Sequence, residues 1–195
     1  KDYIRSLGAN LLEIGETYDD SFLAACELAE TEKMFYVHPV SDRYTVAGQG
    51  TITLELLEQI PDLDQVIVPI GGGGLITGIS FTMKQLKPSV KLVGVMPEGS
   101  AVYYASRQAG NLLTLEHCAS MADACVRKTG EPYLYPYIEQ YVDEIVTVTE
   151  ESIRKAVKMA CLYGKLTLEG AGAMPLAALL ENNQTPEGIR IPKAL

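Results

Sequence analysis

The sequence predicts an α/β protein with a mostly parallel, twisted sheet and helices on both faces. Short apolar segments alternate along the chain with segments of helical period, which is typical of parallel sheets. The segment 66–70, Val-Ile-Val-Pro-Ile, is apolar throughout, as expected of a central strand that is buried on both faces. Four consecutive glycines, Gly71–Gly74, follow it directly and predict a tight turn into a helix.

The elements are expected in a regular order. Strands are predicted at 10–14, 34–37, 65–70, 91–96 and 144–148. Helices are predicted around 22–29 behind a possible N-cap at Thr17, at 46–59, from the glycines to about 86, after Thr149, and at 173–180. The helix after Thr149 should place five small or apolar side chains on one face, namely Ile153, Ala156, Val157, Ala160 and Cys161.

Composition excludes several classes of function. The 195 residues are 47% apolar and 21% charged, which is ordinary for a globular protein. A net charge of −9 argues against binding to nucleic acid or to an anionic membrane surface. The four cysteines form no CxxC pair, so we expect reduced thiols in or near the core of a cytoplasmic protein. Residues 1–7 read like the end of a helix and the first residue is not Met, so we expect a piece of a longer protein.

The glycines at 71–74 are the strongest candidate for a binding site. Ligands of open parallel sheets bind beyond the carboxyl ends of the strands, where this turn lies. Without side chains, successive N–H groups can point at one anion, and the following helix adds its positive end. Leu75-Ile76 follows where a Walker loop needs Lys-Ser/Thr, and the third glycine of GxGxxG is missing. A phosphate monoester therefore fits better than a pyrophosphate, and a turn that binds no ligand is the alternative.

Four motifs resemble those of one family. The segment 68–75, VPIGGGGL, resembles the phosphate loop of fold-type II pyridoxal-phosphate enzymes, specifically the threonine dehydratase and serine racemase family. His38-Pro39 with AGQGT at 47–51, VDEIVTV at 142–148 and EGAGA at 169–173 are similar to further motifs of that family. All four occur in the family's order and spacing over nearly the whole chain. We estimate that the chain corresponds to the C-terminal three-fifths of a typical member.

The resemblance implies a fold, a cofactor and a reaction. It implies the tryptophan synthase β-like fold, with pyridoxal 5'-phosphate held by Gly71, Gly72, Gly73, Gly74 and Leu75 and with Glu169 near the cofactor ring. It further implies an ammonia-lyase that converts serine or threonine to a 2-keto acid and ammonia, in a homodimer. Residues 1–45 would be the remainder of the small domain, and residues 46–195 the large domain without its N-terminal segment.

Other parts of the family's machinery have no match. The Schiff-base lysine of an SxKxRGA-like segment and the SxGN-like substrate loop lie upstream of the matched residues, so no catalytic residue is assigned and the chain alone is expected to be inactive. Met96 and Val102 stand where metal-dependent relatives carry acidic ligands, so no metal site is expected. Ala124 replaces the glycine of ADG and would narrow the pocket.

Two alternatives stay open. The chain could be a non-catalytic relative or a binding fragment, which Met96 and Ala124 favour. It could also belong to a serine racemase, although Val40 replaces the asparagine that racemases place after His-Pro, which favours the dehydratase.

Individual residues also have plainer explanations. His38, which precedes a proline, is more typical of structure than of general-base chemistry. Asp123, flanked by Ala122 and Ala124, is expected to be buried and hydrogen-bonded, and Glu169 among small and apolar neighbours is expected to need partners or a raised pKa. Four tyrosines near two prolines predict surface or subunit packing, and these are Tyr133, Tyr135, Tyr137 and Tyr141.

Overall fold

The computed structural model describes residues 1–15 and 18–182, which form two compact units, Lys1–His38 and the chain from Pro39 onward. The predicted N-cap Thr17 lies outside the described residues. The assignment of 1–45 and 46–195 to a small and a large domain stays a prediction. Within the described residues, no helix is both long and apolar enough to cross a membrane.

The first unit contains two helices, α1 (Asp2–Ser6) and α2 (Tyr18–Thr31). In α2 the predicted apolar face is half-buried, and Phe22 packs edge to face against Tyr36 and His38, with ring centroids 5.9 and 5.5 Å away. The strands predicted at 10–14 and 34–37 are wrong, because both segments are irregular and pair with no strand in the described chain. An apolar run forms a strand only where a partner satisfies its backbone, and sequence pattern alone does not supply one.

The second unit is built on a parallel sheet of three strands in the order β1 (Gln65–Pro69), β2 (Lys91–Pro97) and β3 (Glu144–Val148). Val66 pairs with Leu92, and Gly94 pairs with Ile145. The prediction that 66–70 is the central strand is wrong: β2 is the middle strand of the described sheet, and β1 lies at its edge. The sequence of β1 is apolar throughout, like that of a central strand, because helices cover both of its faces.

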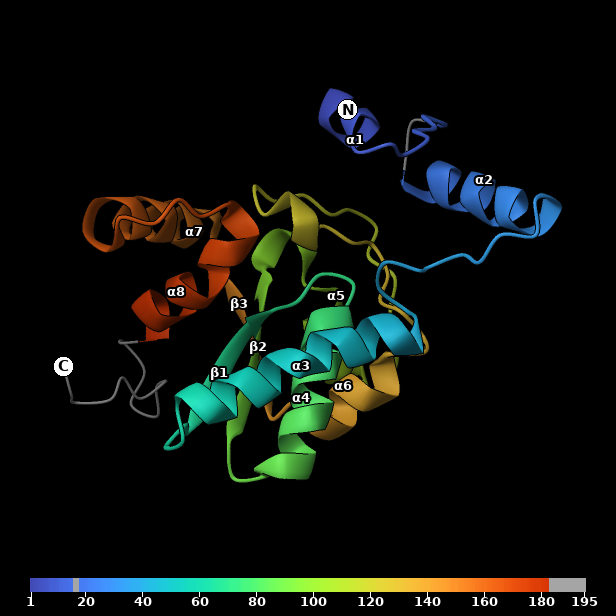
Figure 1. Ribbon diagram of the computed structural model, residues 1–195. Coiled ribbons are helices and arrows are strands. Elements are labelled where there is room, and N and C mark those ends of the chain that lie inside the picture. Colours follow the sequence, from blue (N-terminus) through green and yellow to red (C-terminus); the bar gives the residue numbers. More distant parts are fainter. Residues whose placement is uncertain (16–17, 183–195) are drawn as a thin grey trace. The chain divides into compact units, whose positions relative to one another are not determined.

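Helices cover both faces of the sheet, as predicted (Figure 1). On one face α3 (Arg43–Gln59), α4 (Gly74–Leu86), α5 (Val102–Ala109) and α6 (Tyr135–Tyr141) enclose a core that includes Val68, Leu92 and Ile145. On the other face α7 (Glu150–Met159) and α8 (Gly170–Asn182) enclose a core that includes Val95 and Val148. Alternate strand residues supply the two cores, as the two-residue period of a strand requires.

Local sequence explains where the helices begin and end. The Asp42 carboxylate accepts hydrogen bonds from the N–H groups of Tyr44 and Thr45 at 2.8 and 3.1 Å, so α3 begins slightly before the predicted residue 46. Thr149 caps α7 by accepting from the Ser152 N–H at 3.1 Å. A π turn at Ala160–Gly164 follows α7, and because it changes the helical phase, Cys161 is exposed instead of sharing the buried face.

Helices α3 and α4 pack closely, with backbone near backbone at Gly78. A β-carbon on Gly78 would lie 2.4 Å from the Val46 carbonyl oxygen, so only glycine permits this approach of the two backbones. The buried hydroxyl of Thr53 donates to the Ile79 carbonyl at 3.1 Å across the same contact. Gly50 of the AGQGT motif lies in the same contact, because a β-carbon there would lie 3.1 Å from the Gly78 carbonyl oxygen. The motif therefore has a packing role beside any functional one.

Candidate functional site

A cavity of about 430 Å³ lies at the carboxyl end of β1. Its volume is within the range of small-molecule sites, roughly 300–1,000 Å³. Four segments line it: Pro39 and Val40 with Gln49 of α3, Pro69 with Gly71–Leu75, Ala124 with Cys125, and Glu169, Ala171 and Gly172 at the start of α8. The structure thus brings together all six residues that the sequence predicts to bind a cofactor.

The glycine turn has the conformation of an anion cradle. Gly73 caps the N-terminus of α4 with a φ of 97°, a left-handed value that side chains rarely tolerate. The N–H groups of Gly71, Gly72 and Gly73 donate to no acceptor in the described part of the chain. The first intrahelical bond runs from the Thr77 N–H to the Gly73 carbonyl at 3.0 Å. Several N–H donors therefore remain at the positive end of a 13-residue helix.

The lack of side chains in this turn is required by its neighbours. A β-carbon on Gly71 would lie 2.7 Å from the Ala124 carbonyl oxygen, and one on Gly72 would lie 2.6 Å from Cγ1 of Val40. Other chain segments therefore press against the turn, and larger residues would displace it from the cavity.

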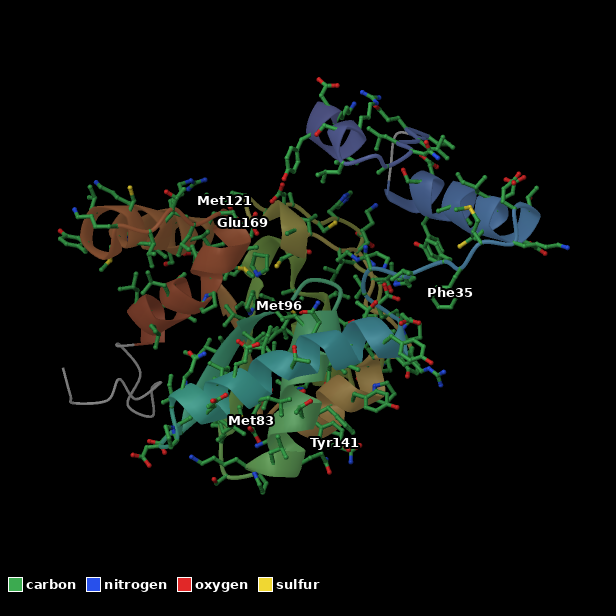
Figure 2. All side chains as sticks on the ribbon, viewed as in Figure 1. Phe35, Met83, Met96, Met121, Tyr141 and Glu169 are labelled. Carbon is green, nitrogen blue, oxygen red and sulfur yellow. The ribbon has the colours of Figure 1, made fainter. Side chains whose placement is uncertain are left out.

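Glu169 is the one charged side chain among the residues that line the cavity. It directly precedes α8, and its carbonyl accepts from the Ala173 N–H at 3.1 Å. Figure 2 shows Glu169 beside Met121, whose carbonyl would lie 2.8 Å from a β-carbon on Gly170. Glu169 is exposed at the cavity although its sequence neighbours are small and apolar, because those neighbours turn into the core with α8, whereas its own side chain does not.

Cys125 is a buried thiol in the cavity wall. Burial, together with the nearby negative charges of Glu169 and Asp123, raises the pKa of this thiol from 9.0 to about 11. The adjacent Asp123 was expected to be buried, but it is exposed, and its carboxylate accepts from the Ala124 N–H at 2.9 Å. A short 3₁₀ turn, Asp123–Cys125, explains this difference, since it directs Cys125 inward and Asp123 outward.

The positions of the family's cation ligands are part of the apolar core. Met96 and Val102 are fully buried in the cluster that α4 and α6 help to form. Among the described residues there is no group of three or more His, Cys, Asp or Glu side chains that could hold a metal ion.

The tyrosines that the sequence analysis singled out are not among the residues that line this cavity. Tyr133 and Tyr137 line a second cavity of about 260 Å³ between α3, α4 and α6, and Phe81 joins them there. The rings of Tyr137 and Tyr141 are stacked with centroids 6.5 Å apart. These three tyrosines therefore pack with one another and with Phe81 of α4, and their packing against another subunit stays a prediction.

Sequence reasoning missed several residues of the cavity wall. Val40 and Gln49 line it beside Pro39, and Cys125 faces the glycine turn from another segment. Gln49 lies inside the AGQGT motif, so the motif itself could have predicted it. Cys125 carries no such indication, because its place depends on a contact between segments more than 50 positions apart.

The cavity fits a phosphate monoester with an attached ring. Unpaired N–H groups at a helix N-terminus match a phosphate dianion, and no basic side chain is needed for that match. The apolar walls formed by Pro39, Val40 and Leu75 match a flat aromatic ring.

Comparisons with known proteins indicate one family over most of the chain. The family model described as “Pyridoxal-phosphate dependent enzyme” matches residues 1–191. The L-threonine ammonia-lyase of Thermotoga maritima is 39% identical over 176 residues, which are 90% of this chain and 44% of that protein.

Solved structures agree with this result. The processed form of threonine deaminase isoform 2 from Solanum lycopersicum has a TM-score of 0.86 at 32% identity, with 91% of this chain and 52% of that chain covered. Maize serine racemase has a TM-score of 0.85 at 31% identity, with 90% and 55% covered. The chain spans about half the length of the curated relatives it matches.

Proposed function

The chain belongs to the family of pyridoxal-phosphate dependent enzymes, and we propose that it forms the phosphate-binding part of a serine/threonine ammonia-lyase. In this proposal Gly71–Gly74 and Leu75 bind the phosphate of pyridoxal 5'-phosphate, and Glu169 lies near its ring. The single observation that supports it best is the glycine turn, whose free N–H groups open into a cavity of suitable size. The relatives named L-threonine ammonia-lyase favour the reaction.

Different residues of the cavity would bind different parts of the cofactor. The N–H groups of the glycine turn would neutralise the phosphate, and the start of α8 adds a second positive helix end beside it. Val40 and Leu75 would hold the ring and exclude water. Cys125 stays a neutral thiol at physiological pH, so it adds no charge to the site. When bound, pyridoxal phosphate supplies an electron sink for bonds broken at the α-carbon of an amino acid.

We expect this chain to hold the cofactor without a covalent bond. No lysine among the described residues lines the cavity, and the carboxylate of Glu169 cannot form an imine. The chain alone should therefore bind pyridoxal phosphate and phosphate, yet leave no lysine labelled when the mixture is reduced with borohydride. Activity would belong to the parent protein.

Binding is tested by titrating the chain with pyridoxal phosphate and following its visible absorbance, then displacing it with inorganic phosphate. Gly71→Val should abolish phosphate-competable binding, since its side chain would meet the Ala124 carbonyl. Gly48→Ala is the matched control in α3, where an added β-carbon has nothing within 4 Å. Equal affinity in both variants would contradict the role of the turn. A borohydride-labelled lysine would contradict non-covalent binding.

The reaction is tested on the parent protein with L-threonine and L-serine. Release of ammonia with a 2-keto acid supports the proposal, and its absence with both substrates refutes it. Serine racemase is the second candidate, because maize serine racemase has nearly the same fold. Conversion of L-serine to D-serine, followed by chiral chromatography, would favour that candidate. Val40 lines the cavity at the position that distinguishes the two, and it favours the lyase.

The assembly and compartment of the parent protein are also proposals. We infer a homodimer in the cytoplasm. The supporting observation for the compartment is that the four cysteines are free, as they are in reducing surroundings. Sedimentation of the parent protein would test the dimer, and a monomer at micromolar concentration would refute it.

A further inference from the structure

The hydroxyl of Tyr103, in the first turn of α5, makes two hydrogen bonds, one to the glycine turn and one to residue 131. Tyr103 is fully buried, and its hydroxyl donates to the Gly72 carbonyl at 2.9 Å. The same hydroxyl accepts from the Glu131 N–H at 2.8 Å. The chemistry of the partners sets the direction of both bonds, because a carbonyl can only accept and a backbone N–H can only donate. The single hydroxyl proton is therefore committed to Gly72.

This bond determines how one peptide group of the turn is oriented. The Gly72 carbonyl and the Gly73 N–H belong to the same peptide plane, and no peptide bond in the described residues is cis. In a trans peptide the two groups point in opposite directions. Tyr103 is not among the residues that line the cavity, whereas Gly72 and Gly73 are. A carbonyl held toward Tyr103 therefore turns the Gly73 N–H toward the cavity.

A peptide between two glycines needs such a restraint. Glycine adopts positive and negative φ almost equally, so the turn has more backbone freedom than any other sequence would have. The Tyr103 ring is itself well fixed, because β-carbons on Gly130 and Gly73 would lie 2.7 Å from the ring and 2.9 Å from the hydroxyl oxygen. Because α5 and the Glu131 N–H hold the ring in place, its hydrogen bond to the Gly72 carbonyl restrains the backbone of the turn.

We propose that Tyr103 is a positioning residue, which orients the Gly72–Gly73 peptide so that the Gly73 N–H donates to a bound phosphate. This inference rests on the proposed function, because it concerns the same anion site. It predicts that the Tyr103 hydroxyl affects the affinity for the phosphate group specifically, and leaves contacts with the cofactor ring unchanged.

The test uses Tyr103→Phe, which removes only the hydroxyl, and Tyr135→Phe as its control. Tyr135 also donates to a backbone carbonyl, that of Ser106 at 3.4 Å, and it is not among the residues that line the cavity. Dissociation constants are measured for pyridoxal phosphate, inorganic phosphate and the unphosphorylated pyridoxal, well below the unfolding temperature. Tyr103→Phe should weaken the two phosphate ligands about tenfold, the effect of losing roughly one hydrogen bond, and change pyridoxal less than twofold. Tyr135→Phe should leave all three constants unchanged.

Each outcome distinguishes the hypotheses. Equal weakening of pyridoxal and pyridoxal phosphate would mean that Tyr103 only supports the fold, and unchanged affinities would also overturn the proposal. If the wild-type chain binds neither phosphate ligand, the proposed function fails and this inference fails with it. A second measurement does not depend on the variant folding: in the wild-type chain labelled with ¹⁵N-glycine, phosphate should shift the Gly73 amide resonance. Binding without that shift would overturn the assignment.

Discussion

Replacing Gly73 by alanine should destabilise the second unit, whereas the same replacement at Gly172 should not. Both residues line the same cavity, but their backbones differ. Gly73 has a φ of 97°, and an alanine there would cost about 1–2 kcal/mol in backbone strain. Its β-carbon would also lie 2.9 Å from both Ile138 Cδ1 and the Tyr103 hydroxyl oxygen, which adds roughly 1–3 kcal/mol.

Gly172 lies inside α8, and its added β-carbon would find only Cγ of Glu169, at 3.9 Å. Alanine should therefore stabilise this helix by about 0.5–1 kcal/mol relative to glycine. The two variants add the same methyl group to the same cavity wall, so their difference isolates the backbone conformation at the turn.

Urea denaturation followed by circular dichroism measures the free energy of unfolding of both variants. We expect Gly73→Ala to lose about 2–5 kcal/mol, a fall of roughly 4–20 °C in Tm, and to bind phosphate at least tenfold more weakly. Gly172→Ala should unfold at or slightly above the wild-type midpoint. The reasoning is refuted if Gly73→Ala unfolds with the wild-type midpoint and slope, because the left-handed conformation would then impose no cost.

Three further substitutions or reagents test other parts of the second unit. The buried Thr77 hydroxyl has no hydrogen-bond partner among residues 1–15 and 18–182, so Thr77→Val should raise the free energy of unfolding by about 1 kcal/mol. A loss of that size in urea titration would reveal a partner. Iodoacetamide at pH 8 should alkylate the exposed Cys161 long before the buried Cys125, since the Cys125 pKa of about 11 leaves about a hundredfold less thiolate than the ordinary value of 9.0. Peptide mass spectrometry measures both alkylation rates, and comparable rates would contradict the burial of Cys125. Asp143→Ala should lower the free energy of unfolding by about 1–3 kcal/mol, because the Asp143 carboxylate accepts from the largely buried Lys84 ammonium at 2.8 Å. An unchanged free energy in thermal unfolding would show that solvent replaces the ion pair.

The strands and the glycine turn of the second unit could be predicted from the sequence because each depends on local pattern. The segments at 65–70, 91–96 and 144–148 form β1, β2 and β3 within one residue. Helix α4 begins at the fourth glycine and ends at Leu86, as expected. An uninterrupted apolar segment followed by glycines leaves few other structures open.

Features that depend on distant contacts could not be predicted in the same way. Helices α5 and α6 were missed, because both are short and rich in tyrosine, a residue typical of strands. The exposure of Glu169 was also missed, because it depends on how α8 packs on the sheet. The role of Tyr103 depends on two backbone groups, in Gly72 and Glu131, that no sequence pattern associates with it.

The two walls of the cavity differ in how far apart their residues lie along the chain, which has a consequence for folding kinetics. Gln49 and Gly72 are 23 positions apart, whereas Gly71 and Glu169 are 98 apart. Closing the longer loop costs about 1 kcal/mol more in chain entropy, and contacts of short sequence separation generally form earlier. The wall between α3 and the glycine turn should therefore assemble first, and the start of α8 should complete it. Recovery of phosphate binding during refolding would then report the last step of folding, after most helical signal has returned.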